Sequence, residues 1–304
     1  RGGKGVRGMS TFEDDVVDQF LALSTHDDLL LFTNKGRVYR IRGFNVPASS
    51  RTSKGVPVVN LISLDEDETV KTLVKVTKDD EDSKYAFFVT KLGLVKRVAV
   101  TEFDSIRQNG KIAITLREDD ELVAVRMTNG DNEIIIGGSN GKAVRFDEDQ
   151  VRAMGRSASG VQGFNVDGGE VVGVATDKEG KYILAVTEFG YGKRTELSEY
   201  RLTNRGAKGV KTVNITEKNG NLIALRAVDG DEELLVISSD GTVIRLAVED
   251  IGIYGRSTIG VRIINVKDGN KVASVAIMKA SEEDEETESD NEDVPRETIE
   301  IVEE

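Results

Sequence analysis

Arginine and glycine residues recur along this chain at a spacing that suits anion binding. The pattern is Arg-x-x-x-Gly followed by Val or Ile, and its full copies begin at Arg1, Arg51, Arg156, Arg205 and Arg256. A sixth copy, beginning at Arg107, is one residue shorter. Glycine lets the backbone approach a phosphate and turn its N–H groups toward it, while arginine and lysine supply positive charge. Regularly spaced loops of this kind suit a phosphate backbone, which is itself periodic.

The copies contain lysines as well as arginines, and the first copy is Arg1, Gly2, Gly3, Lys4 and Gly5. A single Arg-x-x-x-Gly would more simply be a turn whose arginine pairs with a nearby acid. Because the pattern recurs, we expect the loops to share one surface. The predicted phosphate contacts are Arg1, Lys4, Arg7, Arg51, Lys54, Arg107, Lys111, Arg156, Arg205, Lys208, Lys211 and Arg256.

A second repeat, upstream of most of these loops, predicts a β-hairpin. Its five copies span 29–40, 86–97, 134–145, 183–194 and 234–245, each with an apolar or small strand, a polar turn and a glycine. Asn-Gly and Asp-Gly, which occur in two of the turns, are preferred in tight hairpins. An arginine follows each turn glycine by four residues, and packing or ion pairing explains it as well as phosphate contact does. These weaker candidates are Arg40, Arg97, Arg145, Arg194 and Arg245.

A third repeat is an apolar strand that closes each unit, as at 121–125, 170–174, 221–225 and 271–275. The units recur about every fifty residues with four strands each, which is typical of a radial array of blades. The loop and the closing strand occur six times but the hairpin only five. We therefore predict an all-β, six-bladed β-pinwheel, a propeller-like array of four-stranded blades whose first blade lacks its opening hairpin.

The predicted pinwheel covers residues 1–280, and an acidic tail follows it. The unit boundaries are about 1–26 for the partial first unit, then 27–78, 83–129, 132–178, 181–229 and 232–279. Residues 281–304 contain 13 acids and one base, a charge density that predicts a disordered tail. The rest of the chain has 41 acids and 40 bases, so the net charge of −13 does not exclude a basic surface. The tail either competes with a polyanion or keeps the chain soluble.

Groups that commonly perform catalysis or hold metals are scarce in this sequence. It has no cysteine and one histidine, His26, which is followed by two aspartates in what we expect to be a solvated turn. This composition excludes the common zinc sites and cysteine nucleophiles. The glycine-rich stretches lack the Gly-Lys-Ser/Thr of a nucleotide P-loop, and no apolar run approaches the roughly 20 residues of a membrane span. We expect a cytoplasmic chain without a catalytic, cofactor or metal site.

These repeats resemble the C-terminal domain of the bacterial DNA gyrase A subunit. Arg1-Gly2-Gly3-Lys4-Gly5 is similar to the end of that family's Gln-Arg-Arg-Gly-Gly-Lys-Gly box, and the stretches at 57–61, 151–155, 190–195 and 255–260 are also family-like. The resemblance covers residues 1–278. It implies duplex DNA wrapped around a basic outer rim, largely independently of sequence, for ATP-dependent negative supercoiling. The implied partners are the rest of gyrase A and the gyrase B subunit in a heterotetramer, and ATP and magnesium are expected elsewhere in that holoenzyme.

Three other interpretations remain at this point. The C-terminal domain of topoisomerase IV is similar, but its box is degenerate, whereas the glycines and lysine of residues 1–5 are intact. A protein-binding propeller belongs to another class, and its binding would depend less steeply on salt than rim-bound DNA. A propeller enzyme with its site at the central channel lacks convincing acids, bases and metal ligands.

Overall fold

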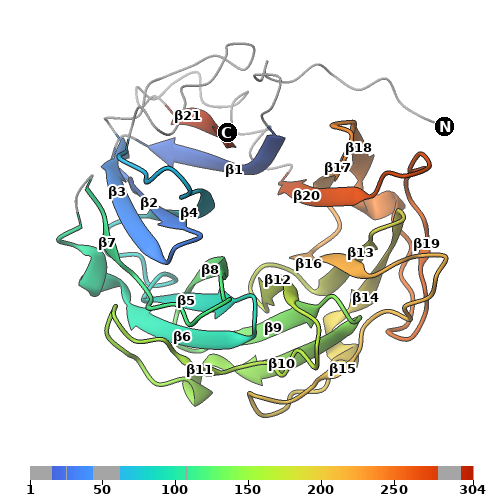
Figure 1. Cartoon of the computed structure of the whole chain (residues 1–304), viewed down its shortest axis with the longest axis horizontal. Helices are drawn as coiled ribbons and strands as arrows, with labels where there is room; N and C mark the ends of the chain where they lie inside the picture. Colours follow the sequence, from blue (N-terminus) through green and yellow to red (C-terminus); the bar gives the residue numbers. More distant parts are fainter. Residues whose placement is uncertain (1–15, 25, 44–61, 107–108, 280–295, 304) are drawn as a thin grey trace.

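Five β-hairpins are arranged around a central axis in the computed structural model (Figure 1). The structure describes residues 16–24, 26–43, 62–106, 109–279 and 296–303. The hairpins are β2 (Asp28–Thr33) with β3 (Arg37–Arg42), β5 (Tyr85–Thr90) with β6 (Leu94–Ala99), β9 (Glu133–Gly138) with β10 (Lys142–Asp147), β13 (Tyr182–Thr187) with β14 (Tyr191–Glu196), and β17 (Glu233–Ser238) with β18 (Val243–Ala247). The turn glycines predicted from sequence all have φ between 77° and 91°, which only glycine adopts without strain.

The predicted closing strands form the inner ring. They are β4 (Val70–Val76), β8 (Leu122–Thr128), β12 (Val171–Thr176), β16 (Leu222–Val228) and β20 (Val272–Met278), and each pairs with the first strand of its own hairpin. Each contacts the next around the ring. β1 (Val16–Ser24) lies between β20 and β4 and contacts both. The sequence repeat therefore becomes a closed circle of inner strands (Figure 1).

The outermost strands are exchanged between units. They are the two-residue strands β7 (Lys111–Ile112), β11 (Val161–Gln162), β15 (Val210–Lys211) and β19 (Val261–Arg262). Each pairs with the second hairpin strand of the unit before it, as β7 does with β3 and β15 with β10. A four-stranded blade thus contains three strands of one unit and one of the next. This exchange is the pinwheel arrangement, which the repeat pattern alone left open.

Two parts of the predicted fold are wrong. The described residues form five blades, four with four strands and one, β18-β17-β20, with three, while the sixth sheet contains only β1 and β21. Among the described residues the first unit contributes only β1, which agrees with the prediction that it lacks an opening hairpin, and β1 pairs with β21 instead of with a hairpin strand. The tail is not wholly disordered either, since β21 (Arg296–Glu303) pairs antiparallel with β1. Residues 281–295 lie outside the described part of the chain.

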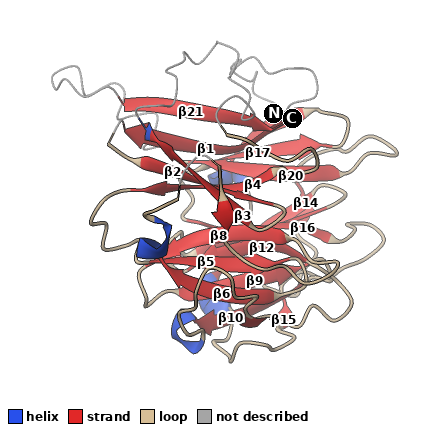
Figure 2. Ribbon diagram, turned by 60° about the vertical axis from the view of Figure 1, so that its left-hand side comes forward, coloured by secondary structure: helices blue, strands red, loops and turns tan. Residues whose placement is uncertain are grey.

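The hydrophobic core lies between successive blades. Phe32 of β2 packs edge-on against Phe88 of β5 and against Phe103 of the 3₁₀ helix η3 (Val100–Phe103), with ring centroids 5.3 and 5.8 Å apart. All three side chains are fully buried. Burying a large apolar side chain contributes about 1.5–3 kcal/mol, so each blade depends on its neighbour for stability. Figure 2 shows the strands of successive sheets layered along the molecule, with only short helical turns between them.

Three further 3₁₀ helices, η4 (Glu148–Gln150), η5 (Leu197–Glu199) and η6 (Val248–Asp250), each follow a second hairpin strand. Within the described ranges, no helix is long and apolar enough to cross a membrane.

Candidate nucleic-acid interface

The predicted phosphate contacts are only partly covered by the structure. Outside the described residues lie Arg1, Gly2, Gly3, Lys4, Gly5, Arg7, Arg51, Lys54 and Arg107. Those inside are Lys111, Arg156, Arg205, Lys208, Lys211 and Arg256. All six lie in an outermost strand or in the loop that leads into one. The structure therefore brings them to the outer edges of successive blades, which together we call the rim.

Most of these rim cations are exposed. Lys111 and Lys211 lie on exposed outer strands, and Lys208 keeps 57% of its side chain exposed while pairing with Asp167 at 3.3 Å. An exposed ion pair of this kind contributes little and does not prevent contact with a phosphate. Lys142 of β10, which the sequence analysis missed, lies opposite Lys211 in the register of β10 and β15. Lys142 lies in a hairpin strand, one residue after a turn glycine, and therefore outside the Arg-x-x-x-Gly pattern from which the phosphate contacts were predicted.

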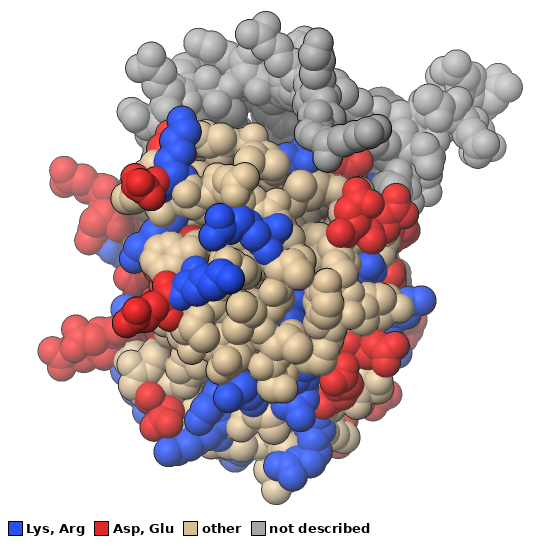
Figure 3. Space-filling view, turned by 90° about the vertical axis from the view of Figure 1, so that its right-hand side faces the viewer, with Lys and Arg blue, Asp and Glu red and all other residues tan. Residues whose placement is uncertain are grey.

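Charges are segregated on the side of the rim seen in Figure 3. Lys and Arg side chains gather along the middle of this view, whereas Asp and Glu lie mainly toward its left and right edges. Because the ring axis runs across this view, those edges are the two faces of the ring. On this side of the molecule, the basic residues lie on the rim and the acidic residues lie on the two faces beside it.

The loop arginines link neighbouring loops along the rim. Arg156 Nη1 donates to the carbonyl of Ile112 at 2.9 Å. Arg205 Nη1 donates to that of Gln162 at 3.0 Å, and Arg256 Nη1 to that of Lys211 at 2.9 Å. Each acceptor is the second residue of the outer strand one unit earlier. The arginines thus have a structural role that the sequence analysis did not predict, and it holds their guanidinium groups at the rim.

The glycine that ends the loop pattern permits the strand exchange. Gly160, Gly209 and Gly260 have φ of 95°, 77° and 78°. A Cβ added at Gly160 would lie 2.4 Å from the Val95 carbonyl oxygen, and at Gly209 it would lie 2.2 Å from that of Ala143. Contacts this short with backbone cannot be relieved by moving a side chain. The glycine therefore lets each loop lie directly against the hairpin of the preceding unit, and phosphate contact is not needed to explain it.

Two buried lysines that the sequence analysis did not single out hold loops of this type. Lys96 of β6 is 0% exposed and Lys193 of β14 is 1% exposed. Lys96 Nζ donates to the carbonyls of Gly155, Arg156 and Ala158 at 3.0, 2.6 and 2.9 Å. The sequence signal was a lysine three residues after the turn glycine in two of the five hairpins.

Most of the weaker candidate arginines are directed between blades. Arg40 Nε donates to Asp28 at 2.8 Å and its Nη1 to the Phe103 carbonyl of the next unit at 3.0 Å. Arg145 similarly joins Glu133, at 2.7 Å, to the Tyr200 carbonyl, also at 2.7 Å. Such contacts favour packing and ion pairing over phosphate contact.

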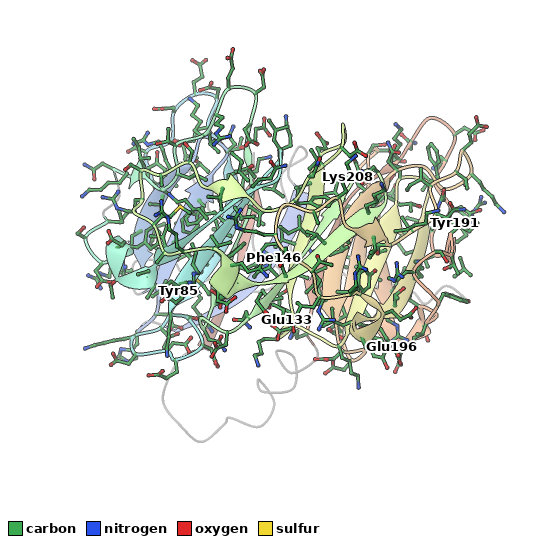
Figure 4. All side chains as sticks on the ribbon, turned by 90° about the horizontal axis from the view of Figure 1, so that it is seen from below. Tyr85, Glu133, Phe146, Tyr191, Glu196 and Lys208 are labelled. Atoms are coloured by element: carbon green, nitrogen blue, oxygen red, sulfur yellow. The ribbon has the colours of Figure 1, made fainter. Side chains whose placement is uncertain are left out.

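The other members of this set make comparable contacts. Arg194 is 8% exposed and its Nε donates to the Ile251 carbonyl at 2.7 Å. The Arg97 guanidinium lies 4.4 Å from the centroid of the Tyr85 ring in its own hairpin, and its Nη1 lies 3.7 Å from Glu148 of the next unit. Arg245 differs from the others, since its ion pair is with Glu233 of its own hairpin. Figure 4 shows Glu133, the partner of Arg145, and Lys208 toward opposite faces of the ring, so this ion pair is separate from that rim lysine. We therefore omit the five arginines from the candidate interface.

No group of three or more His, Cys, Asp or Glu side chains among the described residues is arranged to hold a metal ion. His26 is exposed in the turn before β2, where the sequence analysis expected it.

Comparison with known proteins identifies the family. The family model "DNA gyrase C-terminal domain, beta-propeller" matches six segments, residues 1–23, 27–77, 84–129, 132–176, 181–229 and 232–278. The A subunit of DNA gyrase from Staphylococcus aureus (strain NCTC 8325 / PS 47) is 49% identical over 293 residues, which are 95% of this chain and 33% of that protein. The chain thus spans about a third of the length of that relative.

Solved structures agree with this match. The crystal structure of a DNA topoisomerase IV C-terminal domain superposes with a TM-score of 0.76 at 27% identity, covering 84% of this chain and 80% of that one. A DNA gyrase A C-terminal domain superposes with a TM-score of 0.74 at 25% identity, covering 90% and 92%. The fold is therefore common to both enzymes, while the sequence is similar to gyrase A over nearly its whole length. The resemblance inferred from the loop repeats is confirmed, and the chain belongs to the family of DNA gyrase C-terminal β-propeller domains.

Proposed function

We propose that this chain binds duplex DNA along its rim and bends the duplex around the ring. The observation that carries the proposal is the set of exposed lysines on outer strands and in the loop before one of them, at Lys111, Lys208 and Lys211, with the half-buried Lys142 of β10 opposite Lys211. Phosphate contacts of this kind bind with little dependence on base sequence. Bending a stiff duplex costs several kcal/mol, so many such contacts must act together and no single lysine is essential.

We further propose the setting in which this wrapping acts. As a gyrase-type domain, the chain would present wrapped DNA to strand-passage machinery in the rest of gyrase A and in the gyrase B subunit, in the bacterial cytoplasm. The arrangement would be a heterotetramer that uses ATP and magnesium bound elsewhere for negative supercoiling, while this chain contributes binding and bending without a catalytic group of its own. The family assignment and the similarity to gyrase A support this role.

The rim proposal is tested by removing exposed rim lysines, one of which, Lys208, also forms the exposed ion pair with Asp167. The variant Lys111→Ala, Lys208→Ala, Lys211→Ala removes three rim cations but leaves the loop arginines in place. We expect weaker DNA binding and a salt dependence whose slope falls by about 0.9 for each phosphate that the variant no longer neutralises. We also expect a smaller linking difference when nicked circles are ligated in the presence of the variant.

A control variant removes the same charge away from the rim. Lys71 lies on the inner strand β4, and Lys84 and Lys178 lie in turns next to β5 and β12. Their triple alanine variant should keep both the salt slope and the linking difference. Equal losses in the two variants would show that only net charge matters, and an unchanged rim variant would refute the rim as the DNA track.

A further inference from the structure

Two rim loops fold around a buried lysine amine. Lys96 has three N–H donors when protonated, and its three hydrogen bonds to the loop at 155–158 use all of them. Lys193 does the same in another blade, donating to the carbonyls of Gly255, Arg256 and Thr258 at 2.7, 2.7 and 3.0 Å. The acceptors are the same three loop positions in both cases. Since burying an ammonium costs several kcal/mol unless its donors are satisfied, such a repeated arrangement requires an explanation.

The comparison with another blade separates two kinds of loop. In the hairpin of β9 and β10 the equivalent position is Val144, and the loop it meets is Arg205-Gly206-Ala207-Lys208-Gly209. That loop has its own exposed lysine, whereas the loops at 155–160 and 255–260 both read Gly-Arg-Ser-x-x-Gly and have none. A buried lysine therefore accompanies the loops whose one cation is an arginine.

We infer that Lys96 and Lys193 are positioning residues, whose buried Nζ groups turn the loops at 155–158 and 255–258 inward and so hold Arg156 and Arg256 at the rim. Three carbonyl oxygens converging on one point repel one another, and without a shared donor between them they would turn outward to water. With the lysine in place, each arginine reaches the outer strand of the preceding loop, at Ile112 or Lys211. The inference concerns the loops themselves, and it rests on the proposed function only for its consequence on DNA.

The surroundings of each lysine make its protonation measurable near neutral pH. Burial, with a smaller effect from the Arg156 guanidinium, lowers the pKa of Lys96 to about 8, and the Phe88 ring lies 5.4 Å from its Nζ. Burial also lowers the pKa of Lys193 to about 8, with Glu199 acting to raise it and Arg256 to lower it. An opened loop exposes the lysine to water and returns its pKa toward 10.5, so opening is favoured when the lysine is protonated. The neutral amine keeps two N–H donors and still holds the loop, without the cost of a buried charge.

The test is amide hydrogen exchange of the chain without DNA, which does not depend on the proposed function. The reporters are the N–H groups of Ala158 and Thr258, which donate to the Gly155 and Gly255 carbonyls that the lysines also bind. We expect their protection, corrected for intrinsic exchange, to rise about tenfold between pH 7 and 9. Protection of the loop at 205–209, which contacts no buried lysine, should stay constant and serves as the internal control.

Variants with a neutral side chain that has no hydrogen-bond donor test whether the lysine Nζ groups hold the loops. In Lys96→Met the protection of the 155–158 loop should fall several-fold and its pH dependence should vanish, while the 255–258 loop keeps both. Lys193→Met should show the reverse, and Lys142→Met, at a half-buried position of β10 opposite Lys211, should change neither. If the variants keep loop protection, or if the pH dependence survives in them, the inference is wrong. Should a variant fail to fold, flat protection in the unmodified chain would refute it equally.

Ligation of nicked circles then connects the loops to DNA. The double variant Lys96→Met, Lys193→Met should reduce the trapped linking difference as much as Arg156→Ala with Arg256→Ala does. Loss of loop protection with an unchanged linking difference would support the positioning role and would refute the proposed contact of these two loops with DNA. The failure of the inference and the failure of the proposed function are therefore distinguishable.

Discussion

The exchange of outer strands predicts a specific cost for adding one methyl group. In Gly209→Ala the new Cβ would lie 2.2 Å from the carbonyl oxygen of Ala143, and the residue has φ of 77°. The left-handed conformation costs alanine about 1–2 kcal/mol. Moving the loop away also breaks the bonds from the Thr212 and Val213 N–H groups to the Gly141 carbonyl, at 2.8 and 3.2 Å, worth about 1 kcal/mol each. We expect a total loss of about 3–4 kcal/mol.

The matched control is Gly269→Ala. Gly269 has φ of 82°, but no atom lies within 4 Å of a Cβ added there, so only the conformational cost of about 1–2 kcal/mol applies. Urea denaturation measures both losses, and amide exchange of Thr212 shows whether β15 has left its blade. Equal destabilisation of the two variants, with Thr212 still protected in Gly209→Ala, would refute the claim that the loop glycine exists for backbone contact.

Other predictions concern stability and titration. Between pH 7 and 9.5 the unfolded chain binds more protons than the folded one at Lys96 and Lys193, so the free energy of unfolding should rise with pH by about 2 kcal/mol per lysine relative to the methionine variants. Denaturation at each pH measures this rise. If the free energy of unfolding changed with pH in the same way in the unmodified chain and in the methionine variants, the prediction would be contradicted. Arg145→Met should lower stability by about 2–3 kcal/mol, since it leaves Glu133 and a buried carbonyl without a partner, yet DNA binding by the folded variant should keep its salt slope. Burial raises the pKa of Tyr200 to about 12, and burial together with the hydrogen bond to Glu68 raises the pKa of Tyr39 further, so in an absorbance titration at 295 nm two tyrosines should ionise well above pH 10, and Tyr200→Phe should remove one of them.

Local features of the sequence were sufficient to predict the repeating unit. The hairpins follow from alternating apolar residues and a glycine at each turn, and the structure confirms all five. The position of β1 in the inner ring agrees with the closing-strand pattern as well. These features are predictable because a hairpin turn and the two faces of a strand depend on residues close together in the chain.

Features that depend on distant residues were not predictable in the same way. A two-residue strand such as β15 has too little pattern of its own to reveal its partner, and its exchange onto β10 appears only in the structure. The same holds for β21, whose acidic composition predicted disorder although it pairs with β1. The charge and composition of a segment do not show whether another strand has an unpaired edge. The pairing of β21 depends on such an edge, which β1 provides.

At the rim, the sequence determined which residues repeat, and the tertiary structure decided what they do. Arg156 and Arg256 were recognised as cations of a recurring loop, but their hydrogen bonds to the preceding outer strands depend on blades meeting side by side. Lysine is usually a surface residue, but Lys96 is fully buried. The exchanged loop from the next unit covers its side chain and supplies three carbonyl oxygens to its Nζ. Spacing along the chain records the period of the repeat, whereas the partner of each polar group is set by the unit that lies beside it in space.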